Sequence, residues 1–351
     1  MGKTVIRVIA LLAVCLLLAL CVPTATPLAL FEDPLSELAV LFPVGSLPVT
    51  VYASCIALAA LAACLITVAL GRPKIGLDGS LSLCLAAIPC AVLGARLCYL
   101  LTNLQYIQID LEYSLGRFLW QLWEGGYTLY GAVLGGMVGI WLYTRATRRP
   151  FAVLLDHAAP GAAVALMIAR LGEYFTSEGI GKFIDDEALQ FFPLAVQDTW
   201  GDWSMAVFFY EALAAVVIAV VTWRLLRHDG PAAEVFIILL GLTQILLESW
   251  RMDELIRFGF VRFNQIVSAV LMAAVLALRI IRAVRARGWS PWQTVRIILF
   301  LAGIGVIIAI EFALDKSTID NRLLYVVMAA TLAVMGVSLL AGDRVAQRTK
   351  G

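Results

Sequence analysis

Long apolar runs follow one another along nearly all of this 351-residue chain, and they constrain its fold more than any other feature. An α-helix needs about 20 mostly apolar residues to cross the hydrocarbon core of a bilayer, whereas a membrane β-strand alternates over about 10 residues. The runs here have helical length, in a chain that is 62% hydrophobic and only 15% charged. We therefore predict an all-α fold, a polytopic membrane helical bundle of about ten transmembrane helices.

The predicted spans lie at about 1–22, 48–70, 80–101, 128–146, 154–172, 206–225, 234–250, 265–281, 294–313 and 322–341. Lys3 and Arg7 precede the first apolar run, a pattern typical of a signal peptide or of an uncleaved signal anchor. No convincing small-x-small cleavage site follows the run, so we favour the anchor. We expect three parts: an N-terminal signal-anchor helix and linker at 1–40, a membrane core at 41–290 and a C-terminal transmembrane hairpin at 291–351.

The charges of the connecting segments predict how the spans are oriented. Every second connection is basic, and so is the C-terminal tail. The basic residues of these segments are Arg72, Lys74, Arg145, Arg148, Arg149, Arg224, Arg227, His228, Arg279, Arg282, Arg285, Arg287, Arg296, Arg344, Arg348 and Lys350. The other connections are acidic or mixed, and the largest, at 173–203, holds seven carboxylates against one lysine. By the positive-inside rule, both termini are cytoplasmic and the acidic connections are external.

Two arginines fall at external ends of predicted spans, Arg170 at the end of the fifth and Arg251 at the end of the seventh. A guanidinium at the edge of the hydrocarbon region is costly without a partner or a ligand, so each arginine marks a candidate site. The alternative is an arginine that snorkels to the lipid headgroups. Further polar residues are predicted at the same side, namely Arg96, Asn103, Glu211 and Gln265. This gathering favours a site at the outer mouth of the bundle. By contrast, we interpret Glu311 in the C-terminal hairpin as a charge at a loop edge.

Glycines surround the start of the fourth span. Gly135 and Gly139 have the spacing of small residues that let two helices pack closely. Gly125 and Gly126 precede the span and indicate an irregular backbone at the membrane edge, which would turn Tyr130 towards a wet cavity. The alternative for Tyr130 is an ordinary position in the interfacial aromatic belt.

Metal and nucleic-acid functions find no support in the sequence. The seven cysteines lie in apolar runs without paired spacing, and the two histidines are far apart. We therefore expect neither a metal nor another cofactor. The net charge of +1 gives no basis for binding nucleic acid.

Several motifs, taken in their order along about residues 42–279, resemble prolipoprotein diacylglyceryl transferases. The residues that carry the resemblance are Val44, Gly45, Pro48, Tyr52, Gly94, Ala95, Arg96, Tyr99, Asn103, Trp123, Glu124, Gly125, Gly126, Gly131, Gly135, Asp156, Ala159, Pro160, Arg170, Leu171, Gly172, Glu178, Gly181, Tyr210, Glu211, Glu248, Arg251, Asp253 and Gln265. Each motif alone is weak, whereas the ordered set is specific. The resemblance implies a seven-helix transferase-like core within 41–290, with the first span and the last two outside it.

The resemblance implies transfer of diacylglyceryl from phosphatidylglycerol to the lipobox cysteine thiol of preprolipoproteins, at the outer face of a bacterial cytoplasmic membrane. Arginine binds phosphate bidentately and stays charged, so Arg170 and Arg251 match headgroup binding and stabilisation of the leaving glycerol phosphate. Glu178 and Tyr130 complete the predicted catalytic set. The predicted substrate-binding residues are Tyr52, Arg96, Gly125, Gly126, Gly181, Tyr210, Glu211, Glu248 and Gln265.

The chain departs from the family pattern at two site positions, with Tyr130 in place of a histidine and Glu173 in place of an asparagine. Tyrosine is a poor base at neutral pH but donates a hydrogen bond, and burial would make Glu173 or Glu178 a stronger base. Both departures also fit a divergent paralogue that binds or transfers lipid to another acceptor, or that is catalytically inactive. A transporter would instead place polar residues at mid-membrane within repeated halves, which this sequence lacks.

Overall fold

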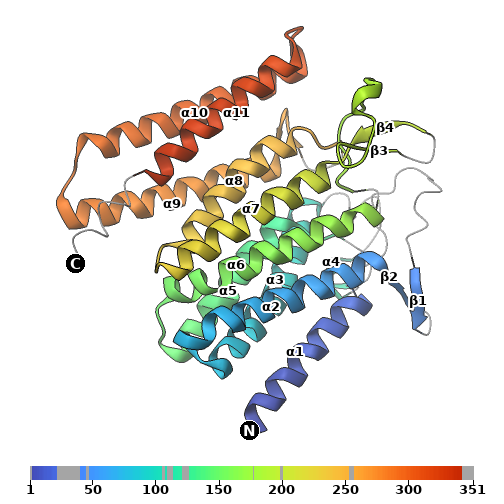
Figure 1. Cartoon of the computed structure of the whole chain (residues 1–351), viewed down its shortest axis with the longest axis vertical. Helices are drawn as coiled ribbons and strands as arrows, with labels where there is room; N and C mark the ends of the chain where they lie inside the picture. Colours follow the sequence, from blue (N-terminus) through green and yellow to red (C-terminus); the bar gives the residue numbers. More distant parts are fainter. Residues whose placement is uncertain are drawn as a thin grey trace. The chain divides into compact units, whose positions relative to one another are not determined.

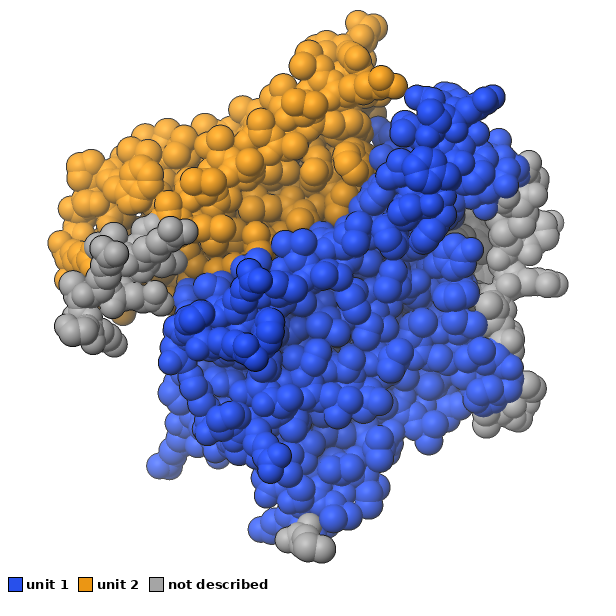
Figure 2. Space-filling view, in the orientation of Figure 1, with its two compact units in different colours: residues 1–233, 251–254 blue, residues 234–250, 255–351 orange. Residues whose placement is uncertain are grey.

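The computed structural model describes residues 2–21, 40–44, 47–104, 107–108, 114–120, 126–176, 178–197, 201–252 and 257–341. The chain forms two compact units, here called unit 1 (residues 1–233 and 251–254) and unit 2 (residues 234–250 and 255–351), which Figure 2 colours separately. Among the described residues, eight helices are long and apolar enough to cross a membrane. The predicted polytopic helical membrane bundle is therefore confirmed.

The described part of unit 1 has six long helices, one short helix and two small hairpins (Figure 1). Its elements are α1 (Gly2–Cys21), β1 (Val40–Val44), β2 (Leu47–Thr50), α2 (Val51–Ile75), α3 (Leu77–Thr102), α4 (Leu115–Trp120), α5 (Leu129–Thr147), α6 (Phe151–Gly172), the single turns η4 (Glu173–Phe175) and η5 (Glu187–Leu189), β3 (Ala195–Gln197), β4 (Trp203–Met205) and α7 (Val207–Arg227). Helix α6 packs against both α2 and α7, and α3 packs against α5.

One end of unit 1 brings together the starts of α2, α5 and α7 and the ends of α3 and α6; we call it the loop end. Two threonine caps begin helices there. The Thr50 side chain accepts a hydrogen bond from the Ala53 amide at 3.1 Å, and Thr128 accepts one from the Gly131 amide at 3.2 Å. Such caps satisfy amides that have no partner within the helix. The opposite end carries basic residues, including Arg149, which donates to the Ile75 carbonyl at 2.9 Å.

Close contact between α3 and α5 depends on glycine. A Cβ atom on Gly135 would lie 2.1 Å from the Cys90 carbonyl oxygen, and one on Gly139 would lie 2.3 Å from the Ala86 oxygen. No side chain fits at these distances, so the predicted small-residue helix packing is confirmed. The packing sets the end of α3 beside the start of α5 at the loop end.

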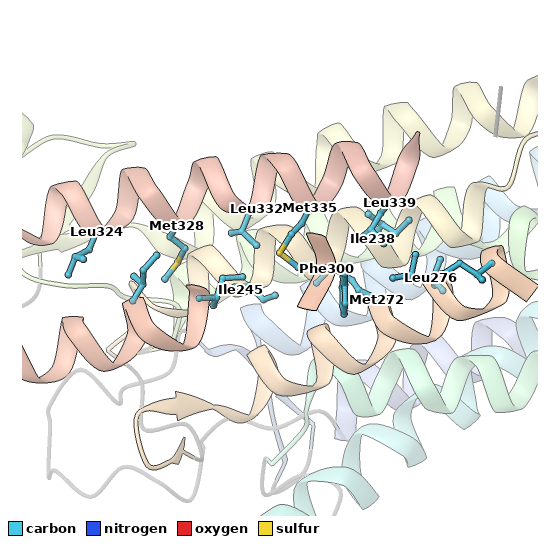
Figure 3. Close-up of a cluster of buried hydrophobic side chains, with 14 residues drawn as sticks. Ile238, Ile245, Met272, Leu276, Phe300, Leu324, Met328, Leu332, Met335 and Leu339 are labelled. Carbon is cyan, nitrogen blue, oxygen red and sulfur yellow. The ribbon is translucent and has the colours of Figure 1, made fainter. Parts of the chain in front are cut away.

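Unit 2 is a set of helices around an apolar seam. Its elements are the part of α8 (Ala232–Glu248) from Glu234 onward, β5 (Arg257–Phe258), β6 (Val261–Arg262), α9 (Phe263–Arg287), α10 (Pro291–Lys316) and α11 (Asn321–Leu340). Figure 3 shows the seam, where Ile245 of α8, Met272 of α9, Phe300 of α10 and Met328 of α11 are all buried. The C-terminal hairpin α10–α11 thus shares one core with α8 and α9.

Each of the ten predicted spans coincides with a helix of the structure. Among the described residues, eight of these ten are the helices long and apolar enough to cross a membrane, and the other two are α5 and α8. The first helix, α1, packs against α2 and α3, and Arg7 forms an ion pair with Asp78 at 3.1 Å. The structure also contains the short helix α4, which the apolar runs did not predict.

Candidate active site

Arg170 lies in the last turn of α6 and is buried, with 7% of its surface exposed. It forms an ion pair and hydrogen bond with Glu173, which begins the η4 turn directly after α6. Its Nε atom lies 3.1 Å from Oε2 of Glu211, in the first turns of α7. Arg170 therefore does not snorkel to the surface but points into a cluster of charges.

Arg251 follows α8 and is 5% exposed. Its Nη1 atom donates to Glu211 Oε2 at 2.8 Å and lies 3.6 Å from Glu173 Oε2. A backbone bridge to Gly181 and a hydrogen bond from the Met252 amide to the Ile180 carbonyl at 2.9 Å hold this segment against the long loop after α6. The structure thus brings together the two arginines that the sequence predicts on one side.

The four side chains of Arg170, Glu173, Glu211 and Arg251 form what we call the charge cluster. Glu173 is 5% and Glu211 2% exposed, so the cluster lies out of solvent. Removing ions from water costs several kcal/mol each, and that cost is offset only where opposite charges meet in good geometry. Here each carboxylate contacts both guanidiniums, so two positive and two negative charges balance. The sequence indicated Arg170, Arg251 and Glu211 at one side and Glu173 as a candidate base, but it did not predict that Glu173 would pair with the arginines.

Tyr52, Glu178 and Gly181 adjoin the charge cluster. Tyr52, in the first turn of α2, interacts electrostatically with Glu178, Glu173, Arg170 and Arg251. A Cβ atom on Gly172 would lie 3.2 Å from the Tyr52 ring, so the end of α6 passes directly over that tyrosine. Gly181 donates its amide to the Met205 carbonyl at 2.8 Å, which joins the loop to β4.

Gly179 closes the charge cluster from the loop side. Its φ angle is +74°, a conformation that favours glycine. A Cβ atom there would lie 2.5 Å from Glu173 Oε2 and 2.7 Å from Phe208 Cβ. The loop backbone therefore passes so close to the Glu173 carboxylate that only glycine fits.

Arg96 is completely buried near the end of α3, in surroundings that differ from those of Arg170. It donates to the Phe118 carbonyl at 2.6 Å and to the Gly126 carbonyl at 3.4 Å, and its guanidinium lies 3.6 Å from the centre of the Phe118 ring. Gly126 has a φ of +77°, and a Cβ atom there would meet the Tyr99 ring at 2.7 Å. Through these contacts, Arg96 joins α3 to α4 and to the segment that precedes α5.

Tyr130 lies in the first turn of α5 and is 1% exposed. Tyr210, one residue before Glu211, donates its hydroxyl hydrogen to the Leu194 carbonyl of the long loop. The predicted site residue Gly125 lies outside the described residues, as does Asp253 of the motif that contains Arg251.

Glu248 and Gln265 lie in unit 2, within what we call the amide network. Asn264 donates to Glu248 at 3.1 Å, and the Nη1 atom of Arg262 lies 3.9 Å from the same carboxylate. Gln265 donates to the Ile245 carbonyl at 3.1 Å and to Glu311 at 2.6 Å. Glu311 belongs to α10 and is 7% exposed, so its interpretation as a loop-edge charge is wrong. A carboxylate this far inside an apolar hairpin needs a hydrogen-bond partner, and Gln265 supplies one.

Comparison with known proteins agrees with the motifs. Residues 39–281 match the family model described as prolipoprotein diacylglyceryl transferase. Two similar relatives are the phosphatidylglycerol–prolipoprotein diacylglyceryl transferases of Streptococcus pneumoniae serotype 4 and serotype 19F. Each is 30% identical over 238 residues, which is 65% of this chain and 87% of the relative. Since the family model extends over most of the membrane core, the chain belongs to the prolipoprotein diacylglyceryl transferase family.

Proposed function

We propose that this chain transfers diacylglyceryl from phosphatidylglycerol to the lipobox cysteine thiol of preprolipoproteins. The observation that carries the proposal is the charge cluster, which holds two buried guanidiniums side by side at the loop end of unit 1. Two adjacent guanidiniums suit the phosphate of an anionic lipid because each presents a planar fork of donors to phosphate oxygens.

The proposed reaction forms one bond and breaks another. The thiol sulfur attacks the carbon of the diacylglyceryl group that bears the phosphate ester. An S–C bond forms, and the C–O bond breaks with its electron pair on oxygen. The leaving group is glycerol phosphate, an anion. Arg170 and Arg251 bind the headgroup and stabilise that anion, and preorganised positive charge away from water is effective for this purpose.

Further residues support this assignment by their positions. Tyr52, Glu178, Gly181 and Glu211 adjoin or belong to the charge cluster and would orient the donor headgroup. The other residues proposed to shape the substrate sites are Arg96, Gly125, Gly126, Tyr210, Glu248 and Gln265. Tyr130 is proposed to act through a hydrogen bond and not as a base. We further propose that both termini are cytoplasmic, so that the loop end of unit 1 faces the outer side of a bacterial cytoplasmic membrane.

A second function has one observation in its favour. Glu173 and Glu211 already pair with the guanidiniums that an anionic lipid would need. A relative that binds another lipid, transfers to another acceptor or has lost activity would have the same arrangement. Restoring growth of a bacterial strain depleted of its own transferase separates the two functions, because only the proposed transferase restores it.

The direct test is transfer to a lipobox peptide in proteoliposomes that contain phosphatidylglycerol. We expect the wild-type chain to lipidate the peptide and the Arg170→Ala and Arg251→Ala variants to be inactive. Full activity of both variants would rule out the assignment. For Tyr130, an inert Tyr130→Phe variant beside an active Tyr130→His variant supports the hydrogen-bond role, and an unchanged Tyr130→Phe rate removes Tyr130 from the mechanism.

A further inference from the structure

The charge cluster is electrically balanced before any lipid binds. Glu173 pairs with Arg170 and lies 3.6 Å from Arg251, while Glu211 lies 3.1 Å from Arg170 and 2.8 Å from Arg251. An anionic phosphate that enters this buried set adds a charge without a counterion, which is costly in a medium of low polarity. Binding of such a lipid therefore requires one carboxylate to leave the guanidiniums.

The two carboxylates differ in how firmly they are held. Glu211 is part of the regular helix α7, and one of its oxygens lies within 3.1 Å of both guanidiniums. Glu173 is on the single turn η4, and its distance to Arg251 of 3.6 Å exceeds hydrogen-bonding range. Thr176 donates hydrogen bonds from both its amide and its hydroxyl to the backbone carbonyl of Glu173, and these bonds end the η4 turn at Phe175. Glu173 keeps a close ion pair with Arg170, whereas Glu211 has close contacts with both guanidiniums. Glu173 therefore has fewer contacts to give up to an incoming phosphate than Glu211.

Both histidines lie far from the charge cluster and are poorly placed to take a proton from an acceptor thiol. His157 is in the second turn of α6, and 13 residues separate it from Arg170. At about 1.5 Å per residue, that separation is about 20 Å along the helix. His228 follows the far end of α7, whose first turns hold Glu211. Glu211 holds both arginines through one oxygen, within 3.1 Å of each, and Tyr130 is a poor base at neutral pH.

We propose that Glu173 is the catalytic base, and that the phosphate of the donor lipid activates it by taking its place on Arg170 and Arg251. This inference rests on the proposed transferase function. A carboxylate held by two guanidiniums is a weak base, whereas one released from them beside a phosphate in a dry site is a stronger base. Binding of the donor lipid would thereby allow Glu173 to deprotonate the acceptor thiol.

The step balances in atoms and charge. The thiol proton passes to the Glu173 carboxylate, and the thiolate sulfur forms its bond to the glycerol carbon. The C–O bond breaks, and glycerol phosphate departs as an anion from Arg170 and Arg251. Glu173 then releases its proton to water and pairs with the arginines again. Glu173 pairs with Arg170 of α6 and lies near Arg251 after α8, and it interacts electrostatically with Tyr52 of α2. Two further carboxylates belong to the same surroundings, because Glu211 of α7 shares both arginines and Glu178 of the loop interacts with Tyr52.

The test replaces Glu173 by glutamine, which keeps its size and hydrogen bonds but does not accept the proton. We expect Glu173→Gln to bind phosphatidylglycerol vesicles at least as tightly as the wild type. Its transfer rate to a cysteine lipobox peptide should fall at least 100-fold, the scale of general-base catalysis. Glu187→Gln, an exposed carboxylate of the same acidic loop, is the matched control and should transfer at the wild-type rate.

A selenocysteine lipobox peptide distinguishes a base from a structural residue, because a selenol is ionised at neutral pH and needs no base. We expect this peptide to restore the Glu173→Gln rate at least 10-fold, but not the Arg170→Ala rate. An unchanged Glu173→Gln rate with the cysteine peptide, or an equal loss with both peptides, would overturn the inference. Selenol rescue of Glu178→Gln in place of Glu173→Gln would also overturn it. Absence of transfer by the wild-type chain would overturn the proposed function, and the inference with it.

Discussion

Carboxylates are buried in both the charge cluster of unit 1 and the amide network of unit 2, but the two sets differ in the side chains that pair with them. In the charge cluster, each carboxylate contacts two guanidiniums. In the amide network, side-chain amides donate to Glu248 at 3.1 Å and to Glu311 at 2.6 Å, while the Arg262 guanidinium lies 3.9 Å from Glu248, beyond hydrogen-bonding range. Guanidinium partners can exchange a carboxylate for an incoming phosphate, since both anions accept the same donors. Side-chain amides carry no charge, so they are weaker partners for an incoming phosphate.

The amide network shows what the C-terminal hairpin does for the family core. Glu311 lies on α10, beyond the segment 39–281 that matches the family, whereas its partner Gln265 lies on α9 inside it. At the other end of the same helices, Arg279 and Arg296 both donate to the Leu339 carbonyl at the end of α11. The hairpin is thus joined to the core helix α9 by buried hydrogen bonds near both of its ends.

The largest effect is expected from truncating an arginine of the charge cluster. Arg251→Ala leaves two buried carboxylates facing one guanidinium, so we expect about 3–5 kcal/mol of lost stability together with lost transfer. Arg282→Ala is the matched control, because Arg282 also pairs with a carboxylate but 57% of its side chain is exposed. Such an exposed pair contributes only about 0–1 kcal/mol. Thermal unfolding in detergent measures the stability of both variants. Equal losses of stability in Arg251→Ala and Arg282→Ala would contradict the contrast between buried and exposed pairs.

The same substitution in both clusters tests the comparison most directly. Glu211→Gln leaves two guanidiniums with one carboxylate, and we expect a loss of about 2 kcal/mol, the scale of a charged hydrogen bond. Glu311→Gln keeps an oxygen that accepts the Gln265 hydrogen bond, so the loss should stay below about 1 kcal/mol. Chemical unfolding of the two variants side by side gives both values. Similar losses would mean that Glu311 also depends on a guanidinium.

Much of the fold could be predicted because membrane helices appear in the sequence as long apolar runs. Apolar run length located all ten long helices, and the alternation of basic connections placed Arg170 and Arg251 on one side. Their common location in the charge cluster agrees with that prediction. Close helix packing at Gly135 and Gly139 could also be predicted, because small residues at this spacing are typical of helices in close contact.

The pairing of polar side chains could not be predicted in the same way. Glu173 follows Arg170 at the i,i+3 spacing that brings side chains together on a helix, but its approach to Arg251 depends on the loop that pairs Gly181 with Arg251. Glu311 and Gln265 are 46 residues apart and meet through the rotation of two helices about their axes. Helix α10 is apolar around most of its circumference, so its sequence gives little periodicity from which its rotation can be read.

A smaller effect is expected at the opposite end of the hairpin. Arg296→Met removes one of the two donors to the Leu339 carbonyl and keeps the apolar stem, while Arg279 still donates at 2.7 Å. Because the carbonyl retains a partner, we expect a loss of about 1 kcal/mol. Thermal unfolding of Arg296→Met beside Glu311→Gln compares the two ends of the hairpin. A loss as large as that of Arg251→Ala would show that the hairpin bonds resemble the charge cluster.

The smallest effect belongs to the exposed pair of Lys74 and Asp229, which shows how an ion pair behaves when water surrounds it. The hydrogen bond and the positive charge of Lys74 lower the pKa of Asp229 below its ordinary value. A lowered folded-state pKa gives stability that is present above the ordinary pKa of about 3.9 and is lost as the pH falls through the folded value. Asp229→Asn, which also tolerates the φ angle of +54° at this position, should therefore lower the unfolding temperature slightly at pH 7. The difference from wild type should shrink as the pH falls below the ordinary pKa and vanish below the lowered folded-state pKa; it should also shrink in high salt, because both charges lie in water. A salt-independent difference that persists in acid would show that this pair behaves like the buried charge cluster.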